Sequence, residues 1–495
     1  MEKRNGLIAQ TNNSNSVSSE KLSLKTKIGF GMGDIYGGGA MVIIGMYYLY
    51  FLTDVLKINP ALAGIVILVS KIWDAVSDPM MGIISDQTRT KYGRRRPYFL
   101  AGFAFIFLSF FILWYPVDFE LESLRFMFAT FAYLFFSTVI TMVMIPYNAL
   151  ASELTLDYNE RTSLTSIRMF FSMFSSILCA VLPLEIIKMF GDMKTGHIVM
   201  ASSFGLLFAL PFIATFLTTK EKKEFQQSSS SFNFKESFFE PFKNRSFRLV
   251  LCMYLFAFLA MDVIMTIVIY FMTYYLEKGD QTNYVLGTLL IVQILVIPLY
   301  SALGKRLGKQ RAFLAGIILW LFAMLTSLII TPNMPSYTVY VFAGIVGIAT
   351  GGVVVMIYAI FADIPDIDEL KSGSRREGVF SGLFTFMRKL SSAFASFIIS
   401  NIIAAAGYKP PIEQAVNGTV QTIQQPQSPE FILALRLIFA VLPVALLILC
   451  LWASLKYPLT PKLHERLRKV LEAQRNNRMN GELIREKLEI QRILI

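Results

Sequence analysis

Two aspartates four residues apart lie in a segment that is otherwise apolar. The stretch KIWDAVSDPMMG contains Asp74 and Asp78, with Lys71 three positions before the first of them. Residues at positions i and i+4 share one face of a helix, so a helix here brings both carboxylates together. An ionisable side chain at the centre of a membrane costs roughly 3 kcal/mol on insertion scales. Two such groups beside a lysine could bind a cation, or could take up a proton when burial raises their proton affinity.

A purely structural role is the alternative for this pair, in which the aspartates only neutralise Lys71 and Lys389 of the later segment TFMRKLSSAF. We favour the cation site, because acidic groups within membrane spans generally mark ion pathways. Pro79 removes a backbone donor directly after Asp78, and such loosened backbone is tolerated where it lines a cavity.

The composition indicates an integral membrane protein. Of 495 residues, 55% are hydrophobic and 16% are charged, whereas soluble proteins have about 25% charged residues. The net charge of +12 is typical of cytoplasmic loops rich in Lys and Arg, so no nucleic-acid partner is expected. Cys179, Cys252 and Cys450 are isolated from one another, and His197 and His464 are the only histidines. Neither a zinc site nor an enzyme active site is predicted, and no cofactor is expected apart from a coupling ion, which Asp74 and Asp78 would bind if it is Na⁺.

Apolar windows of about 20 residues predict an all-α protein with twelve membrane-spanning helices. Their approximate ranges are 28–53, 61–85, 97–116, 124–150, 164–188, 197–219, 247–275, 284–303, 312–331, 336–362, 379–406 and 431–455. The predicted organisation is a cytoplasmic N-terminal tail (1–27), a six-helix bundle (28–219), a cytoplasmic linker (220–246), a second six-helix bundle (247–455) and a basic cytoplasmic tail (456–495).

The two bundles are predicted to be parallel repeats. GRRRPYFLAG (93–102) follows the second helix and GKQRAFLAG (308–316) follows the eighth, and an acidic segment follows the fourth and the tenth helix. Alternate loops are rich in Lys and Arg, which assigns them and both termini to the cytoplasmic side of the cell's inner (plasma) membrane. Repeats of this kind relate the two halves of major-facilitator transporters. In the tail, apolar residues recur at helical spacing after Thr460 and Pro461, which predicts an amphipathic helix lying on the membrane or, equally, a solvated helix.

Five motifs together resemble those of glycoside–pentoside–hexuronide cation symporters, of which the melibiose permeases are the best-known members. They are GxGD (Gly31, Gly33, Asp34), KIWDAVSDPxxG, the GRRRP loop, IPYNALASELTLDYNERTSLTSIRMF (145–170) and ADIPDIDELKSGSRREG (362–378). The resemblance extends over about residues 27–455. It implies a monomeric membrane transporter that takes up a sugar or another small polar solute together with Na⁺ or H⁺, by alternating access.

The resemblance also implies roles for individual residues. The family's cation site corresponds to Asp74, Ser77, Asp78 and Thr141, with Ser77 in place of the usual asparagine. Residues expected to bind substrate or to couple it to the cation are Asp34, Asn148, Arg168 and Lys389.

The sugar site departs from the melibiose permeases. An aspartate of that site corresponds to Met144, a tryptophan to Asn148, and a Lys-Asp pair to Gly37 and Gly38. These differences argue against melibiose as the substrate and leave other glycosides, pentosides or hexuronides open. They also leave open a sodium-dependent lysolipid or other amphiphile transporter on the same fold.

A set of charged residues at the cytoplasmic ends of the helices is expected to form a gate. When the carrier opens outward, the two halves must close on the cytoplasmic side, and Asp86 would then face a cation or a helix N-terminus near residues 377–381 of the other half. The acidic loop residues would meet the arginines of the GRRRP loop. The predicted gating residues are Asp86, Arg94, Arg95, Arg96, Glu153, Asp363 and Asp366.

Overall fold

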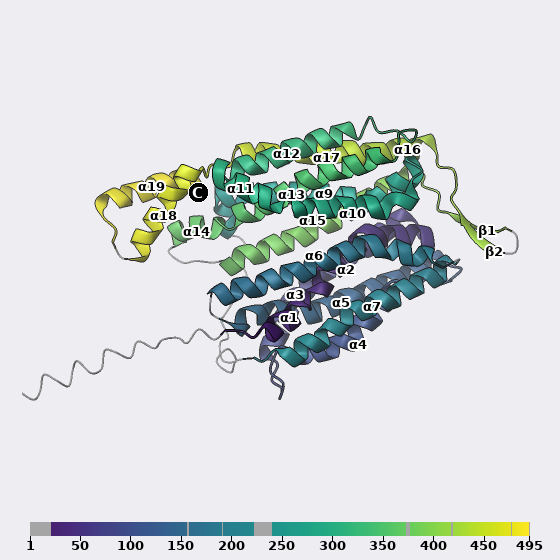
Figure 1. Ribbon diagram of the computed structural model, residues 1–495, viewed down its shortest axis with the longest axis horizontal. Coiled ribbons are helices and arrows are strands. Elements are labelled where there is room, and N and C mark those ends of the chain that lie inside the picture. Colours follow the sequence, from purple (N-terminus) through teal and green to yellow (C-terminus); the bar gives the residue numbers. More distant parts are fainter. Residues whose placement is uncertain are drawn as a thin grey trace, which may run out of the picture.

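The computed structural model describes residues 21–155, 158–190, 192–221, 240–372, 377–416, 419–476 and 478–494. Two bundles of long helices lie side by side, with the purple and blue elements of the first half below the teal to yellow elements of the second (Figure 1). The first bundle consists of α1 (Leu24–Gly31), α2 (Asp34–Ile43), η1 (Ile44–Tyr48), η2 (Phe51–Val55), α3 (Pro60–Gln87), α4 (Arg96–Leu113), α5 (Glu122–Leu154), α6 (Tyr158–Lys188) and α7 (Met193–Thr218).

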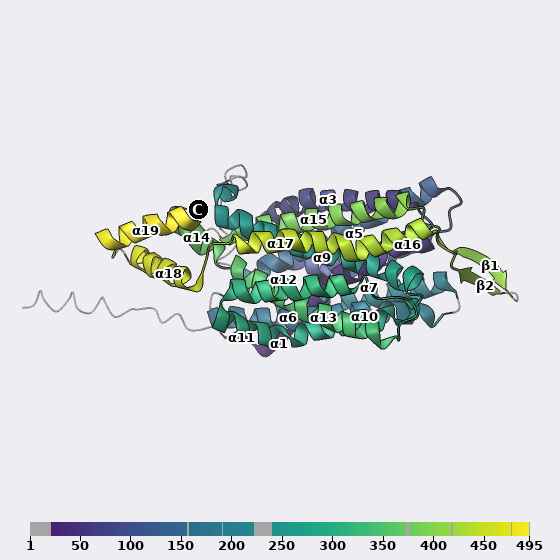
Figure 2. The ribbon, with the colours of Figure 1, turned by 90° about the horizontal axis from the view of Figure 1, so that it is seen from above.

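The second bundle follows a short helix, η4 (Glu240–Lys243). It consists of α9 (Arg245–Tyr270), η5 (Phe271–Tyr275), η6 (Gly279–Gln281), α10 (Thr282–Leu295), α11 (Ile297–Leu307), α12 (Lys309–Thr326), α13 (Tyr337–Phe361), α14 (Ile364–Ser372), α15 (Glu377–Ala405), α16 (Pro429–Arg436), η7 (Leu437–Val441) and α17 (Leu442–Leu455). The bundles meet where α15 packs along α3 and α10 packs against α6. Figure 2 shows α15 beside α3 from a second direction.

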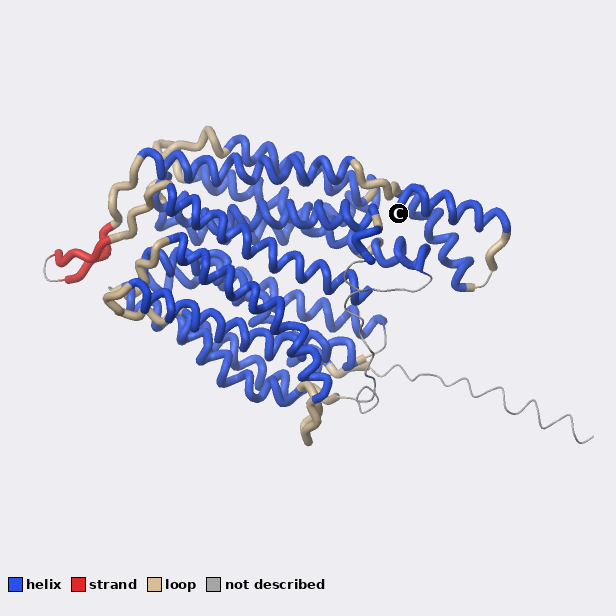
Figure 3. The backbone as a smooth tube through the Cα atoms, turned by 180° about the vertical axis from the view of Figure 1, so that it is seen from behind, coloured by secondary structure: helices blue, strands red, loops and turns tan. Residues whose placement is uncertain are grey.

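The all-helical fold class is confirmed, with two differences from the sequence prediction. Within the described residues, ten helices are long and apolar enough to span a membrane, or eleven if the bent pair α10 and α11 is one span. The predicted helix at 379–406 exists as α15 but is not among them, and it carries the polar residues Arg388, Lys389 and Asn401. A β-hairpin that the hydropathy pattern did not reveal, β1 (Ile412–Val416) and β2 (Thr419–Ile423), projects from one end of the molecule (Figure 3).

The first predicted span is broken rather than continuous. Helix α1 begins at Leu24, earlier than predicted, because the Ser23 side chain accepts a hydrogen bond of 3.1 Å from the backbone N–H of Thr26. The helix is interrupted at the GxGD motif, and α2 restarts with Asp34 in its first turn. A carboxylate in this position is favoured by the partial positive charge of a helix N-terminus.

The C-terminal tail forms two helices, α18 (Pro461–Arg475) and α19 (Gly481–Leu494), beyond the end of the second bundle (Figure 1). The predicted cap is confirmed, since the Thr460 hydroxyl accepts a 3.3 Å hydrogen bond from the N–H of Leu463. The apolar face of this helix packs on protein, which neither alternative included. Leu467 and Val470 are fully buried in the protein, and α18 packs against α19 and α14. We call this end, which carries the tail and the loops around residues 87–96 and 304–311, the basic end, and the opposite one the hairpin end.

Candidate functional site

The two aspartates of α3 face two hydroxyl groups of α5. Ser137 donates a short hydrogen bond to Asp74 Oδ1, and Thr141 donates a 2.8 Å hydrogen bond to Asp78 Oδ1. Asp74 and Asp78 are four residues apart on α3, and Ser137 and Thr141 are four residues apart on α5. Two adjacent turns of α3 therefore face two adjacent turns of α5. Asp74 is 2% exposed. The predicted residues Asp74, Asp78 and Thr141 are therefore brought together, and Ser137 joins them.

Ser137 was missed by sequence reasoning, although a signal for it existed. It precedes Thr141 by one helical turn, as Asp74 precedes Asp78. Ser77 is buried nearby, but its hydroxyl donates at 3.5 Å to the backbone carbonyl of Asp74 rather than to a carboxylate.

Two lysines neutralise this pair of carboxylates. The ammonium group of Lys389 on α15 forms a short ion pair with Asp78 Oδ2 and lies 3.9 Å from Asp74 Oδ2. The ammonium group of Lys71 lies 3.5 Å from Asp74 Oδ2 and 5.9 Å from the centre of the Tyr133 ring. We call Lys71, Asp74, Asp78 and Lys389 the central cluster. Its two negative and two positive charges balance, and Lys389 alone belongs to the second half.

Arg168 lies in a separate cluster of the first half. Its guanidinium donates to Asn148 Oδ1 at 2.8 Å and to Asp34 Oδ1 at 3.3 Å, and it lies 4.8 Å from the centre of the Tyr147 ring. The structure thus brings together three of the four residues expected to bind or couple substrate. It places Lys389 apart from them, against the aspartates of α3.

The positions that depart from the melibiose permeases are tightly packed. A Cβ atom on Gly37 would lie 2.5 Å from the Met144 side chain, and a Cβ on Gly38 would lie 2.2 Å from the Ser172 hydroxyl. Real Cβ atoms do not approach other atoms this closely. Glycine at both positions is therefore required for α2 to pack as closely as it does against α5 and α6.

A further ion pair within the second half was not predicted. Arg388 on α15 forms two hydrogen bonds with Asp262 on α9, one of them 2.7 Å long, and lies 4.8 Å from the centre of the Phe258 ring. Arg388 and Lys389 are neighbours, yet one binds the second half and the other binds the first. The sequence shows the adjacent cations but not their different partners.

At the hairpin end, a network of hydroxyl groups joins the two halves. Asp54 in η2 accepts 2.6 Å hydrogen bonds from Thr53 and from Tyr274 of the second half. The Thr53 hydroxyl also lies 2.6 Å from that of Tyr270, and Tyr274 lies 3.0 Å from Tyr408. Asp54 follows the span that ends at Tyr48, and burial raises the pKa of its carboxyl to about 6. We call this network, which holds the two halves together at this end, the seal.

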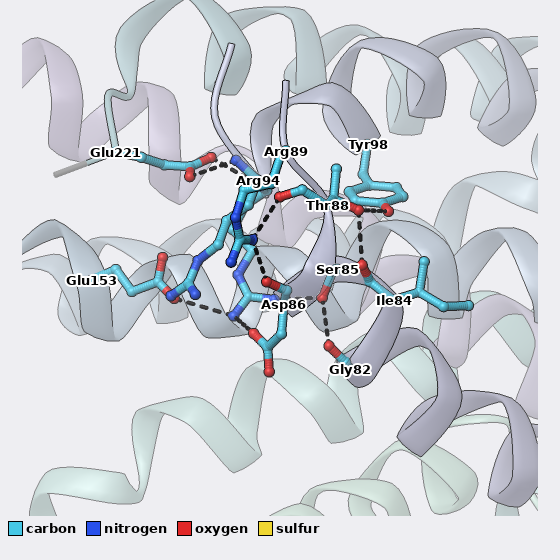
Figure 4. Close-up of polar contacts among 11 residues, drawn as sticks. Gly82, Ile84, Ser85, Asp86, Thr88, Arg89, Arg94, Tyr98, Glu153 and Glu221 are labelled. Carbon is cyan, nitrogen blue, oxygen red and sulfur yellow. Dashed lines mark hydrogen bonds and ion pairs between the residues drawn. The ribbon is translucent and has the colours of Figure 1, made fainter. Parts of the chain in front are cut away.

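The predicted gating residues at the basic end are paired within their own halves. Arg95 contacts Asp86 and Glu153, and Arg94 donates to Glu153 at 2.7 Å (Figure 4). The Glu221 carboxylate, just after α7, accepts three backbone N–H bonds at the start of α4, one of them a 2.8 Å bond from Arg94. Asp86 thus has a cation partner, as expected, but in its own half.

Two other predicted gating residues, Arg96 and Asp363, are also paired within their own halves. Arg96 donates to the backbone carbonyl of Phe216 at 2.7 Å, and Asp363 accepts two bonds, 2.6 and 2.7 Å long, from Lys309. Asp366 lies in the first turn of α14. The expected partner near residues 377–381 falls mostly on side chains outside the described ones. The predicted contacts between the two halves would form when the basic end is closed, and they stay a prediction.

The chain is similar to membrane transporters over most of its length. Residues 29–461 match the family described as MFS/sugar transport protein. An uncharacterized symporter of Synechocystis is 29% identical, with 94% of this chain and 99% of that protein aligned. The isoprimeverose transporter of Lactiplantibacillus pentosus is 27% identical over 77% of this chain and 80% of its own.

Two further similarities bear on substrate and fold. The sodium-dependent lysophosphatidylcholine symporter 1 of Gallus gallus is 23% identical over 92% of this chain and 90% of its own. The crystal structure of the nucleoside transporter NupG is 16% identical and has a TM-score of 0.60, covering 88% of this chain and 99% of NupG. At this identity the match to NupG concerns the fold alone.

Proposed function

The chain belongs to the MFS/sugar transport family, and from this we propose that it is a symporter that couples uptake of a sugar or glycoside to the movement of Na⁺ or H⁺. It is a membrane transporter of the major facilitator fold and not an enzyme. We assign the basic end to the cytoplasm, because Lys and Arg gather in cytoplasmic loops. The observation that carries the proposal is the contact of Lys389, from the second half, with both aspartates of the first.

The charge balance of the central cluster couples cation binding to a change between the halves. Two carboxylates and two ammonium groups are neutral together, so an added cation would leave a net positive charge in a largely buried site. Displacement of Lys389 removes that excess. Lys71 can remain on Asp74, because both lie on the same helix.

The oxygen atoms around the aspartates suit a hard cation. The carboxylates of Asp74 and Asp78 and the hydroxyls of Ser137 and Thr141 converge on adjacent turns, and hard cations prefer oxygen ligands. A proton would act on the same groups by neutralising one carboxylate, which would also release Lys389. Both ions therefore fit the proposed mechanism.

Release of Lys389 frees the first half from the second at the level of the central cluster. Solute binding beside the cluster of Asp34, Asn148 and Arg168, which offers both donors and an acceptor to a polar molecule, would then favour the rocking of the two halves. The coupling is reciprocal, so the solute raises cation affinity by the same factor as the cation raises solute affinity. Alternation to an outward-open form requires the network around Asp54 to separate.

The test is transport by purified protein in proteoliposomes. Candidate glycosides, pentosides and hexuronides are offered with a Na⁺ gradient, with a pH gradient, or with neither. Uphill accumulation of one class under one gradient is expected. Asp78→Asn should abolish that accumulation while the protein still inserts and folds. Uphill uptake by Asp78→Asn equal to that of the unmodified protein would refute the assignment of the central cluster.

A lysophospholipid or a similar amphiphile is the second candidate solute. Its support is the similarity to the lysophosphatidylcholine symporter and the apolar contact between Gly37 and Met144 where sugar-binding groups are expected. The same proteoliposomes distinguish the two, since Na⁺-driven uptake of a lysophospholipid without any uptake of sugars would select this candidate.

A further inference from the structure

A basic cavity of about 700 Å³ opens at the basic end of the second half. It lies where the α11–α12 turn meets the segment between α17 and α18. The charged or ionisable residues that line it are Lys305, Arg306, Lys309, Arg311, Asp363, Lys462 and His464. Asp363 is the only acid among these lining residues, and it is occupied by Lys309 at 2.6 Å. The cavity is within the size range of pockets for small molecules.

The N-terminus of α12 is part of this cavity. Gly308 lines it and has a left-handed backbone (φ 94°), which turns the chain abruptly into the helix. Among the described residues, no oxygen atom accepts the first backbone N–H groups of α12, those of Lys309, Gln310 and Arg311. These N–H groups and the helix dipole attract anions.

A buried hydroxyl group in the wall of the cavity also lacks a partner. Tyr457 is 4% exposed, and among the described residues its hydroxyl has no hydrogen-bond partner. An unsatisfied buried hydroxyl costs about 1–3 kcal/mol, so such a group usually serves a ligand or an ordered water.

The first half contains a similar turn before α4, and there a carboxylate of the protein itself occupies the helix N-terminus. Gly93, like Gly308, has a left-handed backbone (φ 110°) and precedes the helix of the matching repeat. There the Glu221 carboxylate accepts the N–H groups of Arg94, Arg95 and Arg96 at 2.7 to 3.0 Å. Figure 4 shows Glu221 beside Arg94.

The corresponding segment of the second half, after α17, contributes no carboxylate to the cavity and contributes Lys462 instead. The basic side chains around the two turns also differ in whether acids pair with them. Arg94 and Arg95 are paired with acids. Lys305, Arg306, Arg311 and Lys462 are exposed and form no ion pair with any described residue.

We propose that the basic cavity binds a phosphate group, held by the α12 N-terminus, by Arg311 and Lys462, and by the Tyr457 hydroxyl. A phosphate can accept several hydrogen bonds at once, which suits a helix N-terminus surrounded by unpaired cations. Orientation in the membrane requires positive charge in this loop, but it requires neither a cavity nor a helix N-terminus without acceptors. The phosphate can be that of an anionic phospholipid head group or a free phosphate in the cytoplasm.

The experiment compares two charge reversals on the same helix of the full-length protein. Lys462→Glu places a carboxylate at the cavity, as Glu221 does in the first half. Lys469→Glu is the matched control, since Lys469 is an exposed lysine that pairs with Glu465 and lies about 10 Å farther along α18. Binding of inorganic phosphate is measured by equilibrium dialysis in neutral detergent. Retention of phosphatidic acid, against phosphatidylcholine, is measured by native mass spectrometry.

Lys462→Glu should weaken binding of the preferred probe by more than tenfold, since a cation near an anionic surface contributes about fivefold and the new carboxylate also repels the probe. Tyr457→Phe should weaken it by about fivefold without loss of thermal stability, because it removes an unpaired hydroxyl. Binding of phosphatidic acid alone identifies a lipid head group, and binding of inorganic phosphate as well identifies a free phosphate. Equal effects of Lys462→Glu and Lys469→Glu, or binding of neither probe by the unmodified protein, would overturn the proposal.

Discussion

Replacement of Lys389 by alanine removes the one positive charge that the second half contributes to the central cluster. The side chain contacts Asp78 directly and Asp74 at 3.9 Å. Among the described residues, the truncation leaves Asp78 with the 2.8 Å hydrogen bond that Thr141 donates. Asp74 still has Lys71 at 3.5 Å. The uncompensated charge therefore falls on Asp78.

The magnitude follows from this geometry. At 3.9 Å, the distance from Lys389 to Asp74, and an effective dielectric constant of about 20, two unit charges attract each other by about 4 kcal/mol. The contact of Lys389 with Asp78 is closer, so its attraction is at least as strong. Removing one partner of a buried pair costs about 3–5 kcal/mol. Because the side chains of Lys389 and Asp78 are 28% and 20% exposed, water reaches the pair, and we expect a loss near the lower limit, about 3 kcal/mol.

A double-mutant cycle measures which aspartate the lysine serves. The free energy of unfolding is measured in detergent for Lys389→Ala, for Asp78→Asn and for both together, and again with Asp74→Asn. We expect Asp78→Asn to restore about 2 kcal/mol in the Lys389→Ala background, because it removes the stranded charge. Asp74→Asn should restore less than about 1 kcal/mol, since Lys71 already neutralises Asp74. Asp34→Asn, in the separate cluster with Arg168, serves as an additive control.

Two results would refute this reasoning. One is a larger coupling energy with Asp74→Asn than with Asp78→Asn, which would place the lysine on the other carboxylate. The other is a coupling energy below about 0.5 kcal/mol with both, which is the error of additivity for independent sites.

The other predictions concern the hydroxyl groups of α5, the hairpin end and the start of α4. Ser137→Ala should weaken cation binding about fivefold, which corresponds to the loss of one hydrogen bond. Thr130→Ala is the control and should leave cation binding unchanged, since the Thr130 hydroxyl donates to a carbonyl of its own helix. Equal cation titration curves for the two variants would refute this prediction. Tyr274→Phe should shift the carrier toward the outward-open form by about 1 kcal/mol, seen as faster labelling of a cysteine at the hairpin end. Since the pKa of Asp54 is raised to about 6 by burial, the seal should be firmest below about pH 4 and should weaken as pH rises through 6; labelling independent of pH, or unchanged in Asp54→Asn, would contradict this. Glu221→Gln should lower the free energy of unfolding by about 1–2 kcal/mol, as loss of a helix cap does, and an unchanged melting curve would show that the carboxylate is dispensable.

Features that depend on neighbours along the chain were predicted well. The apolar runs predicted where the helices lie, because a span is set by membrane thickness and by the need of each helix to satisfy its own backbone. Some ends and breaks differ, since α6 begins at Tyr158 rather than at 164 and the first span is interrupted at the GxGD motif. The common face of Asp74 and Asp78 followed from helical periodicity. The cap at Thr460 followed from residue type and position alone.

Features that depend on which helices meet were predicted only in part. Ser137 and Asp74 are 63 positions apart, and Lys389 and Asp78 are 311 apart. Periodicity shows which face of a helix is polar, but not which other face it meets or how the helix is rotated. For this reason Lys389, grouped by the resemblance with Asp34, Asn148 and Arg168, lies instead against the aspartates of α3.

The sequence by itself determined that the chain spans a membrane in two repeated bundles and that carboxylates sit within a span, since these follow from local hydrophobicity and spacing. Among the described residues, the tertiary structure decided which buried charges of distant segments pair with each other. Glu221 occupies one helix N-terminus, whereas the matching N-terminus at Lys309 opens into a cavity. The apolar face of the tail is buried against protein, and the halves are sealed at the hairpin end. These outcomes depend on packing between distant segments. In the sequence, several segments could equally well pair with a given polar or apolar face, and only the fold determines which of them comes within contact distance.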